Sequence, residues 1–392
     1  MDQSEKTLKD LLKLADVRIG GKRPQDIQVF DNRFYKRALE GSIGVGESYM
    51  EGWWNSNDLV ETLYKIALAK LPDKVNKNLK LLTFFAKNKI LNVATVKKSY
   101  IVGKVHYDVG NDLYEKMLDK NMNYTCGYWK GLGDPLTAWK NPKNLDKAQI
   151  AKMDLVCRKL KLKPGMKILD TGCGFGNFAK YAAENYKVQV VGFTISQEQA
   201  IKARERCKGL PVEIRHQDYR ELKPDLPAGR QGKFDAIASI GMMEHVTHKN
   251  YKTFLTKMSQ LLADDGYMLL HSIGSPVSVT SFDPWAEKYI FPNSHLPSIA
   301  QIAQAAENNF VFEDLQNFGI YYYPTLMSWW TRFDKSWNNL SKNNPQKYNE
   351  RFYRMWKFYL MGSAAGFKSR DMQLFQIVFS KNKKLNVYES VR

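Results

Sequence analysis

One run of nine residues constrains the fold of this chain more than any other feature. It reads Ile168-Leu169-Asp170-Thr171-Gly172-Cys173-Gly174-Phe175-Gly176: an apolar strand, an acid, and three alternating glycines before a helical stretch. Glycine permits a tight turn and lets a ligand approach the backbone closely. A strand that turns into a helix in this way predicts the first βαβ unit of a parallel sheet.

The segments around this run favour the same fold. Strands are expected at 167–170, 188–193, 212–216, 234–240 and 267–271, and helices at 178–185, 197–208 and 250–262. This alternation predicts an α/β fold with a Rossmann-like sheet, helices on both faces and ligands outside the carboxyl ends of the strands. An acid before the glycines, without the GxGxxG spacing of a pyrophosphate site, is typical of class I methyltransferases, which use S-adenosylmethionine.

The N-terminal part has a different pattern, and we expect a small, mainly helical domain over residues 1–95 before a catalytic domain over 96–392. A first helix is expected around Leu8 to Val17, a glycine-rich turn at 41–46 and a helix that Asn57-Asp58-Leu59 opens with an N-cap. Near the other end, a strand pair is expected at 374–380 and 385–391, and 224–232 is expected to be a surface loop.

Charge and composition narrow the function classes. The net charge of +19 favours polyanionic partners, such as an anionic membrane or nucleic acid, although a generally lysine-rich proteome would also explain it. Residues 65–98 carry nine lysines and one acid among apolar positions, which fits either a helix lying on lipid or the solvated face of an ordinary helix. No apolar run is long enough to cross a bilayer, so a cytoplasmic location is expected. Four scattered cysteines without a CxxC pair, and no HExxH, indicate reduced thiols and no metal site.

Several longer segments resemble one known family, the cyclopropane-fatty-acyl-phospholipid synthases, which also includes the mycolic acid cyclopropane synthases. The matching segments are His106-Tyr107-Asp108-Val109-Gly110-Asn111-Asp112-Leu113-Tyr114, Asn123-Tyr124-Thr125-Cys126-Gly127-Tyr128-Trp129, Gly241-Met242-Met243-Glu244-His245-Val246, Leu269-Leu270-His271-Ser272-Ile273-Gly274, 283–293 and 369–374. The stretch 44–54 resembles the N-terminal domain of the bacterial phospholipid enzymes, which the mycolic acid enzymes lack. The resemblance covers nearly the whole chain.

The resemblance implies a reaction and its setting. A methylene group from S-adenosylmethionine would be added to the cis double bond of an unsaturated acyl chain in a membrane phospholipid, giving a cyclopropane. The enzyme would be a homodimer bound peripherally to the inner face of the cell membrane, with no nucleic-acid partner. A recognised RNA-binding module or an NPPY-like base-flipping motif, expected of the nucleic-acid alternative, is absent from the sequence.

The resemblance also implies two sets of site residues. A bicarbonate ion serving as base would be held by Cys126, Glu244, His271, the backbone of Ile273, and Tyr322. The cofactor contacts would be Tyr124, Thr125, Asp170, Gly172, Cys173, Gly174, Gly176, Thr194, Ile195, Gln199, Asp218 and Tyr219. Where many members carry a cysteine this chain has Ser363, which excludes a covalent thiolate mechanism at that position.

Each of these residues also has a plainer explanation. Glu244 and Asp218 could cap short helices, Ser196 could cap the helix that contains Gln199, and His271 could be a core histidine. Cys126 could be a small buried apolar group.

The chemistry explains why such a set would be needed. An alkene that accepts a methyl cation becomes a carbocation, which aromatic faces stabilise and water would destroy. Ring closure then needs a base within about 3 Å of the new methyl group. A methyl-branching enzyme that quenches the cation differently, or a small-amine N-methyltransferase, remains an alternative.

Overall fold

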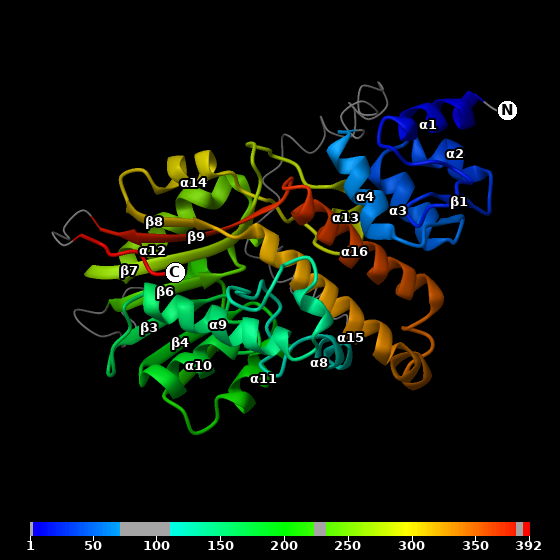
Figure 1. The fold of residues 1–392 in the computed structure, drawn as a ribbon. Helices are drawn as coiled ribbons and strands as arrows, with labels where there is room; N and C mark the ends of the chain where they lie inside the picture. Colours follow the sequence, from blue (N-terminus) through cyan, green and yellow to red (C-terminus); the bar gives the residue numbers. More distant parts are fainter. Residues whose placement is uncertain (1–2, 71–109, 223–232, 382–386) are drawn as a thin grey trace.

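The computed structural model describes residues 3–70, 110–222, 233–381 and 387–392. A seven-stranded sheet of order β5-β4-β3-β6-β7-β9-β8 forms the centre of the larger part (Figure 1). Within this sheet, strands β3 to β7 run parallel, whereas β9 is antiparallel to both β7 and β8. The strands are β3 (Lys167–Thr171), β4 (Gln189–Thr194), β5 (Val212–His216), β6 (Phe234–Ile240), β7 (Leu262–Gly274), β8 (Val311–Asn317) and β9 (Gln373–Ser380).

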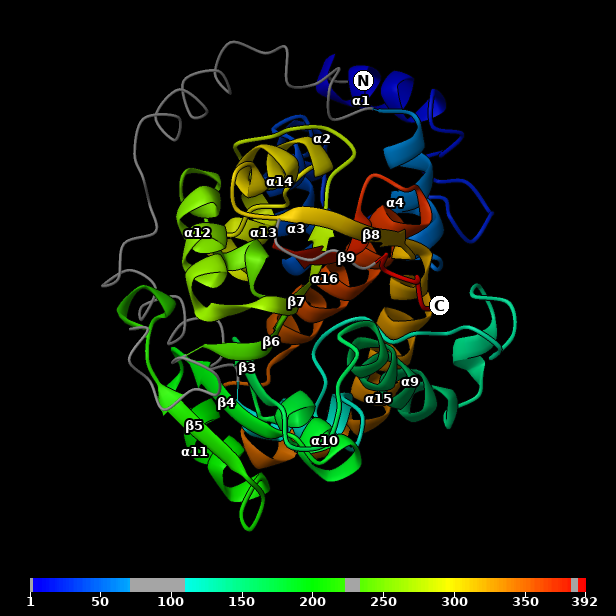
Figure 2. The ribbon, with the colours of Figure 1, turned by 90° about the vertical axis from the view of Figure 1, so that its left-hand side faces the viewer.

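Helices cover both faces of this sheet because the buried strand residues alternate between two apolar clusters. Ile168 packs with residues of α9 (Asn144–Lys159) and α10 (Asn177–Tyr186), while Leu169 packs with residues of α12 (Tyr251–Leu261) and α14 (Ile299–Ala306). The two layers are seen on opposite sides of the strands in Figure 2. α11 (Gln197–Arg206) follows β4 and contacts β4 and β5. The structure therefore confirms the expected Rossmann-like α/β sheet.

Of the two strands expected near the C-terminus, the prediction of the second is wrong. β9 forms as expected, but its neighbours are β7 and β8, and residues 387–391 form no strand. Side chains hold that segment instead, since Tyr388 is buried, packs edge-on against Tyr267 and donates a hydrogen bond to the carbonyl of Lys159 over 2.9 Å. Residues 382–386 and the expected loop 224–232 lie outside the described residues.

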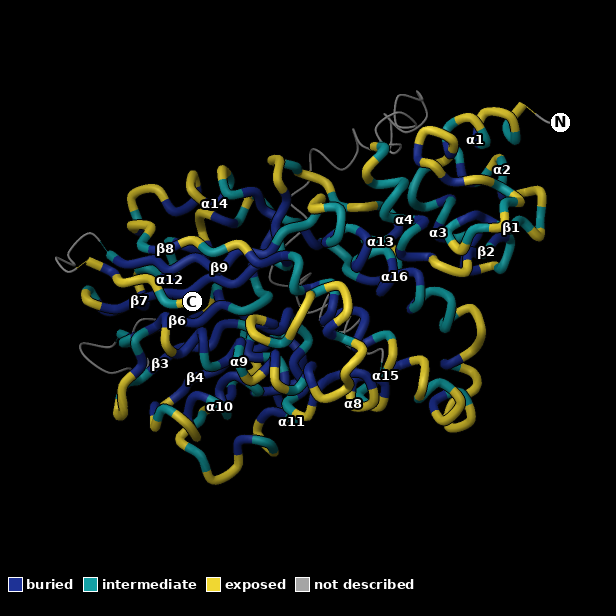
Figure 3. Tube along the Cα trace, viewed as in Figure 1, coloured by how far each residue is buried: buried dark blue, intermediate teal, exposed yellow. Residues whose placement is uncertain are grey.

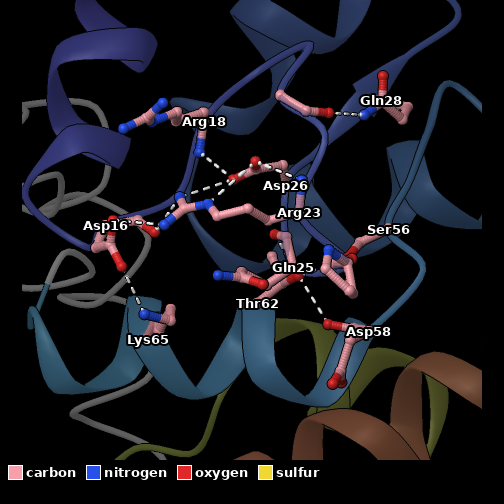
Figure 4. Close-up of polar contacts among 12 residues, drawn as sticks. Asp16, Arg18, Arg23, Gln25, Asp26, Gln28, Ser56, Asp58, Thr62 and Lys65 are labelled. Atoms are coloured by element: carbon pink, nitrogen blue, oxygen red, sulfur yellow. Dashed lines mark hydrogen bonds and ion pairs between the residues drawn. The ribbon is translucent and has the colours of Figure 1, made fainter.

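The N-terminal unit is mainly helical, as expected. It consists of α1 (Gln3–Lys13), β1 (Gln28–Val29), α2 (Arg33–Ala38), α3 (Ser42–Met50), β2 (Trp54–Asn55) and α4 (Leu59–Leu68). Asp58 caps α4 by accepting a hydrogen bond from the backbone N–H of Glu61, as the sequence predicts. An ionic network around Asp16 connects the segment between α1 and β1 to α4 (Figure 4). Arg23 pairs with both Asp16 and Asp26, and the ammonium of Lys65 on α4 lies 2.7 Å from a carboxylate oxygen of Asp16.

The glycine-rich turn expected at 41–46 is wrong, because these residues begin helix α3. The glycines are explained by close packing rather than by a turn. A Cβ at Gly44 would collide with the carbonyl oxygen of Arg37, and one at Gly46 would collide with the indole of Trp285. Gly46 thus lets α3 approach α13 (Pro284–Tyr289) of the larger part.

Two long helices connect the units. α15 (Tyr322–Asn343) and α16 (Glu350–Lys368) pack against each other, and α16 also packs against α3 and α4. Buried residues therefore extend from the sheet into the N-terminal unit (Figure 3). Arg354 donates hydrogen bonds to the carbonyls of Tyr49 and Trp54, and Lys368 pairs with Glu61 over 2.6 Å. The expected boundary at residue 95 and most of the lysine-rich segment lie outside the described residues.

Two further observations complete the fold. α8 (Asn111–Met117) packs on α15, and the start of the first family-like segment, 106–109, lies outside the described residues. Within the described parts of the chain, no helix is both long enough and apolar enough to cross a membrane.

Candidate active site

One cavity of about 530 Å³ lies at the carboxyl ends of β3, β6 and β7 and reaches across α15 and α16 to the N-terminal unit. Most of the expected cofactor residues line one end of it: Tyr124, Thr125, Asp170, Gly172, Cys173, Gly174 and Gln199. Its middle is aromatic. Tyr124 and Tyr359 share a hydrogen bond between their hydroxyls over 2.9 Å, and Phe291 packs edge-on against Tyr359.

Asp170 is the most distinctive group at the glycine-rich end. It is the penultimate residue of β3, is 2% exposed and accepts a hydrogen bond from the backbone N–H of Ala179. Its second oxygen, Oδ2, has no partner among the described residues. Burial raises the pKa of Asp170 to about 7. A buried carboxylate oxygen without a partner indicates that a ligand with hydrogen-bond donors belongs there.

The glycines beside Asp170 leave the backbone open. Gly172 and Gly174 have φ of +72° and +53°, a region that side chains with a Cβ rarely adopt, and a Cβ at Gly174 would meet nothing within 4 Å. The open backbone and the unsatisfied carboxylate fit S-adenosylmethionine, whose amino and hydroxyl groups are donors. Gln199 completes this wall, and its side-chain oxygen accepts from the hydroxyl of Thr194 over 2.9 Å.

The remaining expected cofactor residues do not line the cavity: Gly176, Thr194, Ile195, Asp218 and Tyr219. Thr194 donates a hydrogen bond to the side chain of Gln199, which lines the cavity. Ser196 caps the N-terminus of α11, as expected from the sequence. Asp218 caps the short 3-10 helix Tyr219–Glu221 and pairs with Arg220.

Sequence reasoning missed Lys152, a fully buried residue on α9. Its ammonium donates to Asn123 Oδ1 over 2.9 Å and to Thr125 Oγ1 over 3.1 Å, so it holds the segment that lines the cavity. Burial lowers the pKa of Lys152 to about 8, and its charge lowers the pKa of Asp170. A lysine on a helix of mixed charge gives no sequence signal of this role.

Glu244 lies in the short helix Met243–His245 that follows β6, and it lines the cavity. Its Oε1 accepts from the backbone N–H of Ile273 over 2.7 Å, which brings two expected residues together. Its Oε2 has no partner among the described residues. Burial raises the pKa of Glu244 to about 7.

Tyr322, the first residue of α15, lines the same cavity and stacks on Phe367 at 4.4 Å. Burial holds the pKa of Tyr322 well above its ordinary value, and the backbone of Cys126 hydrogen-bonds to its side chain. Cys126 is itself fully buried, does not line the cavity, and has a raised thiol pKa because of burial. A thiol in this state is not a nucleophile.

His271 is buried on β7, two residues before Ile273, and is not part of the cavity wall. Its Nδ1 is 3.1 Å from the side-chain nitrogen of Gln376, and its Nε2 has no partner among the described residues. Burial holds the pKa of His271 well below its ordinary value, so the ring is neutral.

The structure therefore gathers Glu244, Ile273 and Tyr322 at one wall of the cavity, with Cys126 and His271 buried nearby in contact with that wall's elements. Unpartnered atoms on Glu244 and His271 fit a small ion that both donates and accepts hydrogen bonds, such as bicarbonate. Ser363 of α16 also lines the cavity.

Comparison with known proteins identifies the family. The family described as mycolic acid cyclopropane synthetase matches residues 95–377. The chain is 46% identical over 373 residues to the cyclopropane-fatty-acyl-phospholipid synthase of Escherichia coli K12, covering 95% of this chain and 92% of that one.

Two crystal structures are similar in fold. The mycolic acid cyclopropane synthase CmaA1 in complex with SAH and CTAB superimposes with a TM-score of 0.62 at 27% identity, covering 72% of this chain and 98% of that one. Coclaurine N-methyltransferase, bound to N-methylheliamine and SAH, gives a TM-score of 0.66 at 19% identity over 86% of this chain and 99% of that one.

Proposed function

Because the chain belongs to the mycolic acid cyclopropane synthetase family of S-adenosylmethionine-dependent methyltransferases, we propose that it forms cyclopropane rings on unsaturated acyl chains of membrane phospholipids. The observation that carries the proposal is one cavity that joins three features. These are the open glycine loop with Asp170, an aromatic middle, and the unpartnered carboxylate oxygen of Glu244. The 46% identity to a phospholipid synthase over 95% of the chain supports phospholipid as the substrate.

Bound S-adenosylmethionine supplies the methyl group, and a bound bicarbonate ion supplies the base that removes a proton from it. The protein's own part is to orient both and to exclude water. Asp170 would accept hydrogen bonds from the cofactor, and the aromatic rings of Tyr124, Tyr359 and Phe291, which line the cavity, would stabilise the carbocation that forms on the acyl chain.

The Glu244 wall orients the base. With its pKa near 7, Glu244 can hold a proton and donate it to an oxyanion, so two negative charges need not face each other. The hydroxyl of Tyr322, which lines the cavity, would supply a further hydrogen bond, whereas the assignment of His271 to the ion stays a prediction because its buried ring does not line the cavity. Among the described residues, Ser363 in the wall carries only a neutral hydroxyl and Cys126 is a buried thiol outside the wall, so neither would be a strong nucleophile toward the cation.

The remaining parts of the proposal concern the setting. We propose that residues 1–95 form a lipid-associating domain, that 96–392 form the catalytic domain, and that the enzyme acts as a homodimer on the inner face of the cell membrane. The charge of +19 supports attraction to anionic lipid.

The function is tested by incubating the purified protein with labelled S-adenosylmethionine and vesicles of dioleoyl phosphatidylglycerol. The expected product is an acyl chain heavier by about 14 mass units that has lost its double bond, because one CH2 is added. A methyl-branched chain that keeps a double bond would favour the branching alternative. An unchanged lipid, with methylation of a small amine instead, would overturn the proposal.

Lys152 gives a first prediction about the cofactor end. Lys152→Met removes a positive charge that lowers the pKa of Asp170, so the pKa of Asp170 should rise. Because only the ionised carboxylate of Asp170 accepts hydrogen bonds at both oxygens, the pH midpoint of S-adenosylhomocysteine binding should rise together with the pKa of Asp170. Calorimetry from pH 6 to 9 measures this midpoint. Lys159→Met is the matched control, because Lys159 is a buried lysine of the same helix that hydrogen-bonds Gln316 instead. Equal midpoints in all three proteins would contradict the assignment.

A further inference from the structure

A row of three polar side chains crosses the antiparallel edge of the sheet. β9 lies between β7 and β8 (Figure 1), and its Gln376 is in register with His271 of β7 on one side and with Gln316 of β8 on the other. Residues paired in this way point to the same face of a sheet. Here it is the face that α9 covers, because Lys159 of α9 donates a hydrogen bond to Gln316 over 2.8 Å. Gln376 is 0% exposed, so its amide can find partners only inside the protein.

The contact between Gln376 and His271 determines where the imidazole carries its proton. The side-chain nitrogen of Gln376 lies 3.1 Å from Nδ1 of His271. An amide nitrogen only donates, so Nδ1 accepts, and a neutral imidazole that accepts at Nδ1 carries its proton on Nε2. The ring is neutral because burial holds the pKa of His271 well below its ordinary value, and the positive charges of Lys152 and Lys159 lower that pKa further. His271 therefore presents an N–H donor at Nε2.

This donor lacks an acceptor. Nε2 of His271 is buried and has no hydrogen-bond partner among the described residues. Buried N–H groups without a partner are rare in folded proteins, so such a group indicates a bound acceptor. Ile273, two residues further along β7, points to the same face of the strand and lines the cavity. An oxygen of a small anion held at this wall would satisfy the donor.

We propose that Gln376 is a positioning residue: it fixes the Nε2–H tautomer of His271, so that the ring meets the anionic base as a neutral hydrogen-bond donor. The inference rests on the proposed function. A neutral donor orients an anion without neutralising its charge, so the anion keeps the basicity that it needs to remove a proton from the new methyl group. An imidazolium would lower that basicity, and a ring with its proton on Nδ1 would turn a lone pair toward the anion.

Nitrogen-15 NMR of the ligand-free protein at pH 8, with its histidines labelled, tests the tautomer directly. The chain has six histidines, and the signals of His271 are identified by their loss in His271→Asn. The expected spectrum shows a proton on Nε2 and none on Nδ1. A proton on Nδ1 in the unmodified protein would overturn the inference, and this measurement needs no variant of Gln376 to fold.

Gln376→Glu replaces the donor by a carboxylate, which only accepts, so the proton of His271 should move to Nδ1. In buffer freed of CO2, the bicarbonate concentration that gives half-maximal ring formation should then rise by about 10–100-fold, as expected when one hydrogen bond to a charged group is lost. The affinity for S-adenosylhomocysteine should stay within about twofold. Gln376→Met offers neither donor nor acceptor to the ring, and its bicarbonate requirement should rise less than that of Gln376→Glu.

The matched control is Gln316→Met, which removes the neighbouring amide of the same row. Gln316 hydrogen-bonds Lys159 and Tyr128 rather than His271, so this variant should keep the Nε2 proton and the bicarbonate requirement of the unmodified enzyme. An unchanged bicarbonate requirement in Gln376→Glu, or an equal rise in Gln316→Met, would overturn the inference. Absence of any ring on oleoyl chains with the unmodified enzyme would instead overturn the proposed function, whereas the NMR result does not depend on ring formation.

Discussion

Glu244→Gln is expected to lower the turnover of ring formation by about 10²–10⁴-fold, while the affinity for S-adenosylhomocysteine stays within about twofold. The amide keeps the size of the side chain and can still accept the hydrogen bond from Ile273, but it cannot exchange a proton with the base. Radiolabel incorporation into lipid gives the turnover, and calorimetry gives the affinity. Glu287→Gln is the matched control, because that carboxyl is partly buried in α13 and does not line the cavity.

The same substitution should also change stability in a pH-dependent way. The pKa of Glu244 in the folded protein is raised from 4.5 to about 7, so the folded state binds the proton more tightly than the unfolded state does. Stability therefore falls as pH rises from about 4.5 to above 7. The difference in unfolding free energy between Glu244→Gln and the unmodified protein, both ligand-free, should therefore be more favourable to the variant at pH 8 than at pH 4.5, by about 2–3 kcal/mol. A variant that is inactive and equally destabilised at both values would indicate a structural role only.

Asp170→Asn is expected to weaken S-adenosylhomocysteine binding at pH 8 by about 10–100-fold, because a hydrogen bond to a charged acceptor contributes roughly 1.5–3 kcal/mol. The buried carboxylate has one oxygen without a partner among the described residues, so its expected partner is the ligand. Asp154→Asn on α9 is the matched control, since that carboxylate pairs with Arg158 away from the cavity. Undiminished affinity would exclude Asp170 as a cofactor contact.

The pH dependence should change together with the affinity. The pKa of Asp170 is about 7, so binding to the unmodified protein should weaken as pH falls below 7, by up to tenfold per pH unit. Asp170→Asn has no group to titrate there and should show nearly constant affinity between pH 6 and 8. A pH profile that persists in Asp170→Asn would place the titrating group elsewhere.

Much of the fold follows from local sequence. The β3–loop–α10 unit forms because an apolar strand, an acid and glycines that accept positive φ follow one another, and each strand expected in the parallel part of the sheet is present. The cap at Asp58 is likewise local, because the side chain bonds a backbone N–H only three residues away. Of the residues assigned to the ion by resemblance, Glu244, Ile273 and Tyr322 line one cavity and Cys126 and His271 do not, and the roles of all five stay predictions.

What the sequence could not determine depends on partners that are distant along the chain. β8 and β9 join the sheet through antiparallel pairing across more than fifty residues, so 387–391 was mistaken for a partner of β9. Lys152 resembles a solvated helix residue until Asn123 and Thr125 are folded against it, and only then is its buried charge satisfied. Local order is determined by the backbone preferences of neighbouring residues, whereas burial, pKa and the shape of a cavity arise only when remote elements exclude water together.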